Sequence, residues 1–349
     1  MNLIIKQDID TICQETLPWE KLKNKKIVVT GANGFLASYM IYTLLEKNKS
    51  LDLNMTIYAF CRNKNKANAK FGEYQSQSAL HIIYQDIMQV IDDKYRSDII
   101  IHAASPSTPY EVNNSPYSVI EANILGYDLL LKKCQAWKCE SLMLFSSSSV
   151  YGYRTPSDGA DENYRAKINF ADSKDVYYLS KQMAEMMTAS MCQSLKQCNI
   201  NIVRPFVVFG PGECYSHKKC MTDFLKNAIL NEDIVLKSKG DAVRSYIYIS
   251  DAVRAFFYIL LKGNGEAYNV ASEYGVCSIK ELANLFSSVR TGIKVVSNFK
   301  DDKYLDNHSH YIVGKNDKIK RLGWSEKVTL SEGLQRTISW AEDSDFLNS

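Results

Sequence analysis

The feature that most restricts the possible folds is an apolar run near the N-terminus that leads directly into a glycine-containing turn and a helical pattern. Lys26–Thr30 (KIVVT) is typical of a buried parallel strand, and Gly31 and Gly34 follow it at once. Glycines permit a tight turn and close backbone approach, and a helix N-terminus offers N–H groups to a pyrophosphate. The unit predicts a dinucleotide site, although a GxxG pattern alone is weak evidence.

Further strand-like runs alternate with helical stretches along most of the chain. Alternation of this kind predicts an α/β fold with a doubly wound parallel sheet and ligands at the carboxyl ends of its strands. With 349 residues, the chain is long enough for one large α/β domain and a smaller companion. The later predicted strands are 55–61, 81–84, 99–103, 141–146, 200–203, 245–249 and 267–271.

Composition narrows the classes of function. A formal net charge of +3 without a basic block gives no indication of nucleic-acid binding. No apolar run reaches the roughly 18 residues of a membrane span, and the N-terminus does not resemble a signal peptide. The nine cysteines are scattered and form no CxxC pairs. This pattern favours reduced thiols in a cytoplasmic protein and disfavours a zinc site. His308 and His310 lack acidic or thiol partners, so we expect an exposed loop there and no metal site.

Tyr177 and Lys181 form a YxxxK pattern about thirty residues after a strand-like run that ends in serines. Residues four apart share one face of a helix. An ammonium beside a phenol favours the phenolate and lowers a pKa of about 10, so the tyrosine exchanges protons with an alcohol or ketone. A nearby serine hydroxyl can hold the same substrate oxygen. The pattern predicts hydride transfer at a carbon that bears oxygen, with a nicotinamide cofactor.

Two long amphipathic helices are expected, over 115–133 and 174–197. In folds of this kind such helices often pair across a two-fold axis, which makes a homodimer a reasonable expectation. The alternative is that both helices only cover the sheet.

The motifs together resemble the extended short-chain dehydrogenase/reductase family that acts on nucleotide sugars, a group of epimerases, dehydratases, decarboxylases and reductases. The resemblance implies a Rossmann domain (1–205 and 244–272) and a smaller C-terminal nucleotide-sugar-binding domain (206–243 and 273–349), with the substrate in the cleft between them. The motifs are TGANGFLAS (30–38), HAAS (102–105), Asn123 with Gly126, SSSSVYG (146–152), YYLSK (177–181), RPFVVFGPG (204–212), RSYIYISDA (244–252), YNVAS (268–272) and RLGW (321–324).

The resemblance also implies roles for individual residues. Ser147, Tyr177 and Lys181 fall on the catalytic positions of the family. Substrate contacts fall on Ser147, Ser148 and Arg244, where the planar guanidinium suits a diphosphate. The cofactor positions are Gly31, Asn33, Gly34, Phe35, Leu36, Arg62, Asp86, Ile87, Ala103, Ala104, Ser105, Asn123, Tyr177 and Lys181, although Asn123 is expected to brace this region more than to take part in chemistry.

Three departures from the family pattern matter. Ser148 and Ser149 replace the acidic residues of dehydratases and decarboxylases, which disfavours elimination of water, unless Asp158, Asp161 or Glu162 substitutes. Arg62, near Lys64 and Lys66, replaces the acid that usually faces a ribose 2′-hydroxyl, so NADP is favoured and NAD is the alternative. Val207 replaces a polar residue that touches the sugar, so the sugar's identity stays open.

We therefore expect an NADP(H)-dependent reductase of an NDP-4-keto-6-deoxyhexose, active in surface-polysaccharide sugar biosynthesis. A 4-epimerase with tightly held NAD is the alternative, because Ser147 and Tyr177 serve both reactions. Dehydratase or decarboxylase activity ranks third. A nucleotide sensor without turnover is disfavoured, because such proteins commonly lose the tyrosine or the lysine, and this chain has both.

Overall fold

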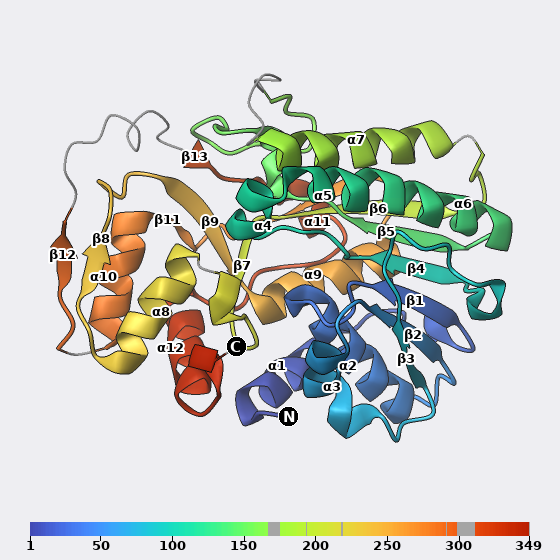
Figure 1. Ribbon diagram of the computed structural model, residues 1–349, viewed down its shortest axis with the longest axis horizontal. Helices are drawn as coiled ribbons and strands as arrows, with labels where there is room; N and C mark the ends of the chain where they lie inside the picture. Colours follow the sequence, from blue (N-terminus) through green and yellow to red (C-terminus); the bar gives the residue numbers. More distant parts are fainter. Residues whose placement is uncertain (167–174, 193, 218, 291, 299–310, 349) are drawn as a thin grey trace.

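The computed structural model describes residues 1–166, 175–192, 194–217, 219–290, 292–298 and 311–348. Its centre is a seven-stranded sheet with the strand order β10-β6-β5-β4-β1-β2-β3, in which every neighbouring pair is parallel (Figure 1). The predicted α/β fold with a doubly wound parallel sheet is confirmed. The strands are β1 Lys26–Thr30, β2 Thr56–Cys61, β3 Leu80–Tyr84, β4 Ile99–His102, β5 Ser141–Phe145, β6 Asn199–Pro205 and β10 Ala267–Val270.

Helices cover both faces of this sheet (Figure 1). One layer contains α5 Pro116–Ile120, the π-helical segment η4 Glu121–Gly126, α6 Tyr127–Trp137 and α7 Val176–Met191, with α4 Pro109–Asn114 beside it. The opposite layer contains α1 Leu3–Cys13, α2 Phe35–Ser50, α3 Lys64–Phe71 and α9 Ile249–Lys262. Short 3-10 helices are η1 Trp19–Leu22, η2 Gly72–Tyr74, η3 Asp93–Tyr95, η5 Ser148–Tyr151, η7 Tyr215–His217 and η8 Phe346–Asn348.

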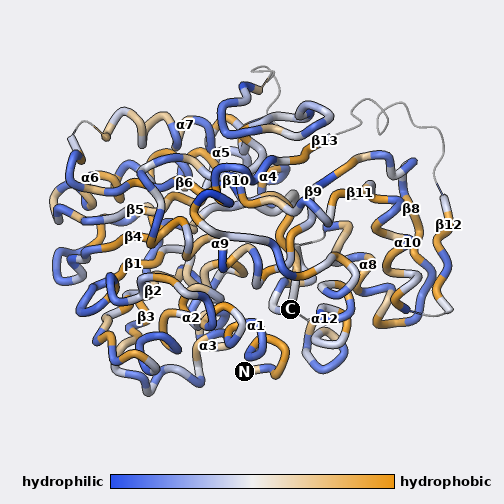
Figure 2. The backbone as a smooth tube through the Cα atoms, turned by 180° about the vertical axis from the view of Figure 1, so that it is seen from behind, coloured by the Kyte–Doolittle hydropathy of each residue, from blue (hydrophilic) through white to orange (hydrophobic). Residues whose placement is uncertain are grey.

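The apolar strands occupy the interior because the sheet has helices on both sides. Every residue of β4 and β5 is buried, as are the last four residues of β1. Strands covered on both faces are apolar throughout rather than alternating, and Figure 2 shows hydrophobic residues concentrated along the central strands and α9. In α9 every residue from Ile249 to Leu261 is buried, so this helix forms part of the core.

A second lobe is built from the C-terminal half of the chain. Its mixed sheet joins β7 Val207–Phe209, β9 Val243–Tyr248, β11 Val276–Ser278 and β13 Tyr311–Ile312, and β8 Ile234–Leu236 pairs with β12 Val295–Ser297. Its helices are α8 Cys220–Leu230, α10 Ile279–Val289, α11 Asp317–Lys320 and α12 Leu330–Glu342. The predicted division into two domains stays a prediction. Most of β9 falls in the predicted Rossmann domain (244–272), but among the described strands β9 pairs with β7, β11 and β13 of the smaller sheet.

The two long predicted helices differ in detail from the structure. The predicted helix 115–133 is a succession of α5, η4 and α6 that runs on to Trp137. The predicted helix 174–197 ends at Met191, and its first residue lies outside the described residues. At η4, a Cβ on Gly126 would lie 3.0 Å from a Cγ atom of Ile87, so a glycine allows this segment to approach the residues that follow β3.

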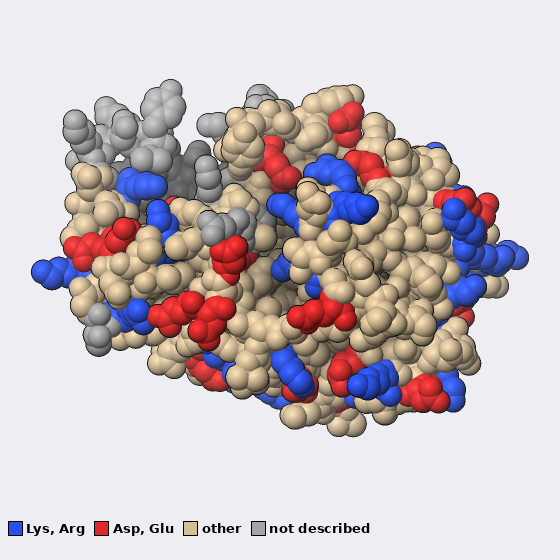
Figure 3. Space-filling model, turned by 60° about the horizontal axis from the view of Figure 1, so that its bottom comes forward, with Lys and Arg blue, Asp and Glu red and all other residues tan. Residues whose placement is uncertain are grey.

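The surface carries charges of both signs. On the face in Figure 3, acidic and basic side chains are interspersed around a central hollow, and neither sign forms a continuous block. Among the described residues, no helix is both long enough and apolar enough to cross a membrane.

Glu15 follows helix α1 and anchors it through buried charge. Its carboxylate accepts hydrogen bonds from Arg254 Nε (2.7 Å), Tyr258 Oη (2.7 Å) and Lys327 Nζ (2.6 Å). Burial alone would raise the pKa of Glu15, but these hydrogen bonds outweigh it and lower the pKa to about 2. A carboxylate whose pKa is lowered by folding stabilises the native state above its unfolded pKa, and this contribution is lost as the pH falls.

We expect the Glu15→Gln variant to reveal this loss as a pH dependence of stability. The advantage of the wild type over Glu15→Gln in free energy of unfolding should shrink by about 2 kcal/mol between pH 6 and pH 3, because the unfolded carboxyl takes up a proton that the folded one resists. Urea unfolding of both proteins at several pH values measures this. A difference that stays constant with pH would contradict the assigned role of Glu15.

Candidate active site

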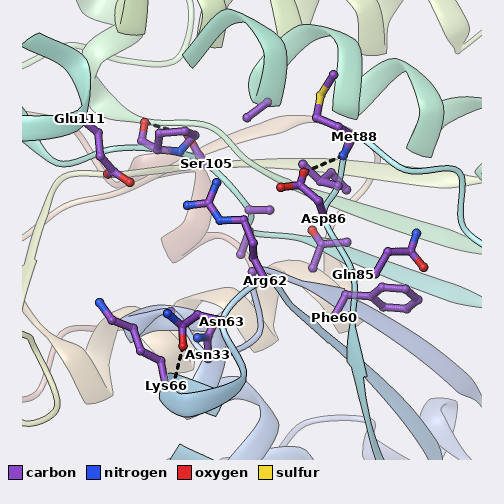
Figure 4. A pocket seen from close by; sticks show the side chains of 18 of the residues that line it. Asn33, Phe60, Arg62, Asn63, Lys66, Gln85, Asp86, Met88, Ser105 and Glu111 are labelled. Carbon is purple, nitrogen blue, oxygen red and sulfur yellow. Dashed lines mark hydrogen bonds between the residues drawn. The ribbon is translucent and has the colours of Figure 1, made fainter. Parts of the chain in front are cut away.

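A cavity of about 430 Å³ opens at the carboxyl ends of β1 to β4. Its floor contains Gly31 and Gly34 from the turn after β1, and its walls come from the segments that follow β2, β3 and β4 (Figure 4). Parallel strands of a doubly wound sheet end at one edge, so residues far apart in sequence meet there. Ten of the predicted cofactor residues line this cavity: Gly31, Asn33, Gly34, Phe35, Arg62, Asp86, Ile87, Ala103, Ala104 and Ser105.

Gly31 is required by the backbone around it. Its φ is +65°, and a Cβ there would lie 2.7 Å from both Cα and N of Ala104. Any other residue would therefore push apart the turn after β1 and the segment after β4. Gly34 is the N-cap of α2 and no side chain caps this helix, so its first N–H groups face an approaching ligand without a side-chain competitor. The turn therefore fits the pyrophosphate of a dinucleotide.

Basic side chains occupy one wall of the cavity. Arg62 projects into the cavity from the end of β2, with Asn63 and Lys66 beside it (Figure 4). Lys64, which the sequence placed near the same phosphate, instead has its Nζ 5.6 Å from the ring centroid of Tyr84 and is not among the lining residues. The sequence reasoning missed Lys70, which lines the cavity one helical turn after Lys66; this four-residue spacing is the signal that identifies it.

The segment after β3 forms the opposite wall. Asp86 Oδ1 accepts a hydrogen bond from the Met88 backbone N–H at 2.9 Å, and Ile87 contacts Gly126 of η4. Asn123, also in η4, is buried and donates to Ser180 Oγ at 3.0 Å. Neither Asn123 nor Leu36 lines the cavity, so Asn123 braces the helix layer instead.

Tyr177 and Ser147 lie close together in the structure. The side chains of Ser147 and Ser105 lie near the Tyr177 phenol, so the ends of β4 and β5 meet the first turn of α7 there. Ser147 also accepts a hydrogen bond from the Ser149 N–H at 3.1 Å, which fixes its position at the start of η5. Ser105 belongs to the cavity lining, so the phenol lies at the border of the cavity.

The charge state of Tyr177 differs from the sequence expectation. Burial raises the pKa of Tyr177, and the nearby hydroxyls of Ser147 and Ser105 only partly offset this. Lys181 does not lower it, because its Nζ lies over the ring, 5.9 Å from the centroid, and donates to the Phe145 carbonyl oxygen at 2.7 Å. Burial also lowers the pKa of Lys181 to about 7, against the charge of Glu185.

Glu185, one turn after Lys181, connects α7 to the sheet. Its carboxylate accepts two hydrogen bonds from Arg204 (2.9 and 2.6 Å) and one from Ser146 Oγ (2.5 Å). Arg204 also donates to Tyr151 Oη at 2.8 Å. The bidentate pair fixes the orientation of α7 relative to β5 and β6.

The acids that could replace the missing acidic pair are engaged elsewhere. Asp158 pairs with Lys315 at 2.5 Å and its side chain is 71% exposed. Asp161 accepts from the Asn163 N–H at 2.9 Å. Glu162 accepts from the Asn269 N–H at 2.9 Å. None of the three carboxylates, those of Asp158, Asp161 and Glu162, is therefore a partner of Ser148 or Ser149.

Arg244 approaches the start of α7 from the second lobe. Its guanidinium interacts electrostatically with Tyr178, Tyr246 and Cys220, and burial lowers the pKa of Arg244. Tyr178 stacks edge-on with Tyr153 at 5.2 Å between ring centroids. Arg244 therefore lies near the residue that follows Tyr177.

Among the described residues no group of three or more His, Cys, Asp or Glu side chains could hold a metal ion, and His308 and His310 lie outside the described residues.

The fold and the site define an α/β protein with a glycine-lined cavity at the carboxyl ends of its parallel strands, and Tyr177 lies near Ser105 of the cavity lining. The model of the NAD dependent epimerase/dehydratase family matches residues 27–271, and the chain belongs to this family. The predicted resemblance to extended short-chain dehydrogenases/reductases is confirmed, as is the prediction of an NAD(P)-dependent enzyme of this type.

Known relatives are similar over nearly the whole chain. A dTDP-D-glucose 4,6-dehydratase of Dictyostelium discoideum is 24% identical over 92% of this chain and 82% of its own length. The Bos taurus enzyme of the same name is also 24% identical, over 92% and 89%. Among solved structures, a UDP-glucose 4-epimerase of Thermotoga maritima with UDP-glucose has a TM-score of 0.78 at 20% identity, covering 91% and 98% of the two chains. A dTDP-glucose 4,6-dehydratase of Bacillus anthracis in complex with NAD has a TM-score of 0.76 at 20% identity, covering 91% and 97%.

Proposed function

We propose that the protein is an NADP(H)-dependent reductase of a nucleotide-diphosphate-linked 4-keto-6-deoxyhexose, in surface-polysaccharide sugar biosynthesis. The observation that carries the proposal is the contact of the Tyr177 phenol with the Ser147 hydroxyl at the border of a cavity that fits a dinucleotide. Ser147, Tyr177 and Lys181 are the catalytic residues in this proposal. Arg244, near Tyr178, would bind the diphosphate, and Ser148 would contact the sugar.

Each of these side chains has a defined task in the reduction. When bound, the nicotinamide supplies the hydride that goes to C4 of the sugar. Tyr177 donates the proton to the C4 oxygen, and Ser147 donates a hydrogen bond to the same oxygen. Burial raises the pKa of Tyr177, so the phenol holds the proton that a reduction consumes. Lys181, held by the Phe145 carbonyl, is positioned to bond the cofactor ribose.

A 4-epimerase is the second candidate. The same three residues would serve it, and the overall fold is shared with a protein named as a UDP-glucose 4-epimerase. An epimerase must both oxidise and reduce the same carbon, so it keeps its dinucleotide through the whole cycle. Retention of the cofactor therefore separates this candidate from the reductase.

Dehydration ranks lower despite the names of the similar proteins. Both relatives described above are named dTDP-D-glucose 4,6-dehydratase. Removal of water needs an acid and a base near the sugar, and Ser148 and Ser149 supply neither at neutral pH. The buried carboxylate nearest in sequence to Tyr177 is Asp175, which accepts a hydrogen bond from Tyr153 Oη. Asp175 would have to take over this chemistry if water were removed.

We expect the purified protein to consume one NADPH for each NDP-4-keto-6-deoxyhexose, measured by absorbance of the reduced nicotinamide over a panel of such sugars. Tyr177→Phe should lower the rate at least about 100-fold, because the proton donor is lost, with dinucleotide affinity nearly unchanged.

Other outcomes of this assay identify other reactions. Conversion of an NDP-hexose without added cofactor, with NAD recovered on denaturation, would favour the epimerase. Formation of a 4-keto-6-deoxy sugar from an NDP-hexose would identify a dehydratase. Full turnover by Tyr177→Phe would contradict its assigned role under every scheme.

Preference for NADP over NAD forms part of the proposal. Arg62, Lys66 and Lys70 line the cavity, and no acidic residue stands at position 62. A guanidinium matches a 2′-phosphate in charge and geometry. The Bacillus anthracis neighbour was solved with NAD, which keeps NAD as the alternative.

We expect Arg62→Ala to weaken NADPH binding about tenfold and to leave NADH binding nearly unchanged, because only NADPH carries the 2′-phosphate. Lys64→Ala is the matched control, since Lys64 lies over the Tyr84 ring and should affect neither cofactor. Titration of cofactor fluorescence measures both affinities. A wild type that prefers NADH, or an equal loss for both cofactors, would contradict the preference.

The proposed homodimer rests on exposed apolar residues in the α5–α7 layer. Tyr117 is 67% exposed, Leu125 48%, Met183 51% and Met186 62%. Helices α5 and α7 lie side by side on one face of the molecule (Figure 1). Apolar side chains gathered on one surface mark an interface.

The cytoplasmic location stays a prediction, and all nine cysteines are free.

We expect the wild type to have the mass of a dimer, and Met186→Glu to shift it to the monomer, because a buried charge opposes association. Light scattering after size-exclusion chromatography measures the mass. Leu51→Glu is the control, since Leu51 is 48% exposed after α2, on the opposite layer, and its mass should not change. A monomeric wild type would end the dimer proposal.

A further inference from the structure

We infer that Asp8, in the helix that precedes the family-matched region, is a positioning residue for the cofactor cavity. It would act through Tyr39 on the loop 210–214, two of whose residues, Gly212 and Cys214, line the cavity. The inference rests on the dinucleotide site proposed above. It assigns a role in cofactor binding to α1.

Asp8 is a fully buried carboxylate with three side-chain partners. Its residue is 1% exposed. Arg336 Nη2 donates to Oδ1 at 2.7 Å, Tyr248 Oη donates to Oδ2 at 3.0 Å, and Tyr39 Oη lies 3.3 Å from Oδ2. The partners come from α12, from the end of β9 and from α2. A buried charge with this set of partners fixes the relative positions of all three elements.

Tyr39 connects this carboxylate to the cavity. Its hydroxyl donates to the Pro211 carbonyl oxygen at 2.9 Å, so one phenolic proton lies between that carbonyl and Asp8. Burial, and then the charge of Asp8, raise the pKa of Tyr39, which keeps the phenol a donor. The Tyr39 ring also lies beside Phe35, with 6.2 Å between ring centroids, and Phe35 lines the cavity.

Gly212 lies directly against this tyrosine. Its φ is +93°, and a Cβ there would lie 3.6 Å from the Tyr39 ring and 3.5 Å from Lys70 Nζ. Lys70 Nζ donates to the Gly212 carbonyl oxygen at 3.1 Å. The loop is therefore held by Lys70 on one side and by Tyr39 on another, and both supports belong to the dinucleotide-binding half. A displaced Tyr39 hydroxyl would leave the Pro211 carbonyl without this donor and release one support of the loop.

The chain offers a matched control in Glu15. Like Asp8, it is a buried carboxylate of the N-terminal segment with an arginine, a tyrosine and a further partner. None of Glu15, Arg254, Tyr258 and Lys327 lines the cavity. Both carboxylates anchor α1, but only Asp8 contacts a residue that touches the cavity loop. A purely structural role for α1 would make the two substitutions equivalent.

The experiment compares Asp8→Asn with Glu15→Gln in the full-length protein. Fluorescence titration with NADPH and with NADH should show the dissociation constants of Asp8→Asn raised about fivefold, the effect of one hydrogen bond. Glu15→Gln should keep the wild-type values, although thermal unfolding shows it destabilised. The rate at saturating cofactor should stay unchanged in Asp8→Asn. Unchanged dissociation constants in Asp8→Asn, or an equal rise in Glu15→Gln, would overturn the inference.

Tyr39→Phe provides a second route, which also applies if Asp8→Asn does not fold. It removes the hydroxyl and should raise the dissociation constants by a similar factor. Where both single variants fold, the double variant should be no worse than either, because they break one chain of contacts. The inference would be overturned if Tyr39→Phe bound the cofactor with wild-type affinity. It would also be overturned if the effects of the two substitutions on the dissociation constant multiplied in the double variant. A wild type that binds neither NADPH nor NADH would overturn the proposed function as well, whereas the other negative outcomes leave it intact.

Discussion

The structure depends on the close approach of two backbone segments at one edge of the sheet. The turn after β1 and the segment after β4 touch at Gly31, where a Cβ would lie 2.7 Å from Ala104. This approach aligns the ends of four parallel strands around a single cavity, and it places Ser105 on the side of the cavity that faces Tyr177. The position of the Tyr177 phenol relative to the cavity therefore depends on this approach, which a side chain at position 31 would prevent.

Polar networks keep helix α7 in register with that edge. Lys181 donates to the Phe145 carbonyl, and Glu185, one turn later, binds both Arg204 and Ser146. Three successive residues at the end of β5, from Phe145 to Ser147, thus contact side chains of α7. Because each contact is directional, the helix can neither slide nor rotate without breaking several of them. An interaction that positions Ser147 therefore also positions Tyr177.

Much of this arrangement could be predicted from the sequence, because it follows from local patterns. All seven strands of the large sheet were expected within one or two residues. The clearest of them are β1, β4 and β5, since strands buried on both faces are apolar throughout. The π-helical segment η4 was not predicted, because the spacing of apolar residues does not distinguish it from the α-helices on either side. Asp8 and Glu185 were missed for another reason. Their partners lie far away in the sequence, and neither hydropathy nor spacing encodes a pairing such as Asp8 with Arg336.

The same limit explains why the sequence predicted a lowered pKa for Tyr177, whereas burial raises it. Spacing placed Lys181 one turn after Tyr177, but it could not show that the ammonium bonds to a carbonyl, away from the phenol hydroxyl. Burial then acts on the two groups in opposite directions, raising the pKa of Tyr177 and lowering that of Lys181 to about 7, so that each moves toward its neutral form. A protonated phenol is the form that delivers a proton to a reduced carbonyl, whereas oxidation would begin from the phenolate that burial disfavours. Desolvation of the site therefore disfavours the charged form of both side chains.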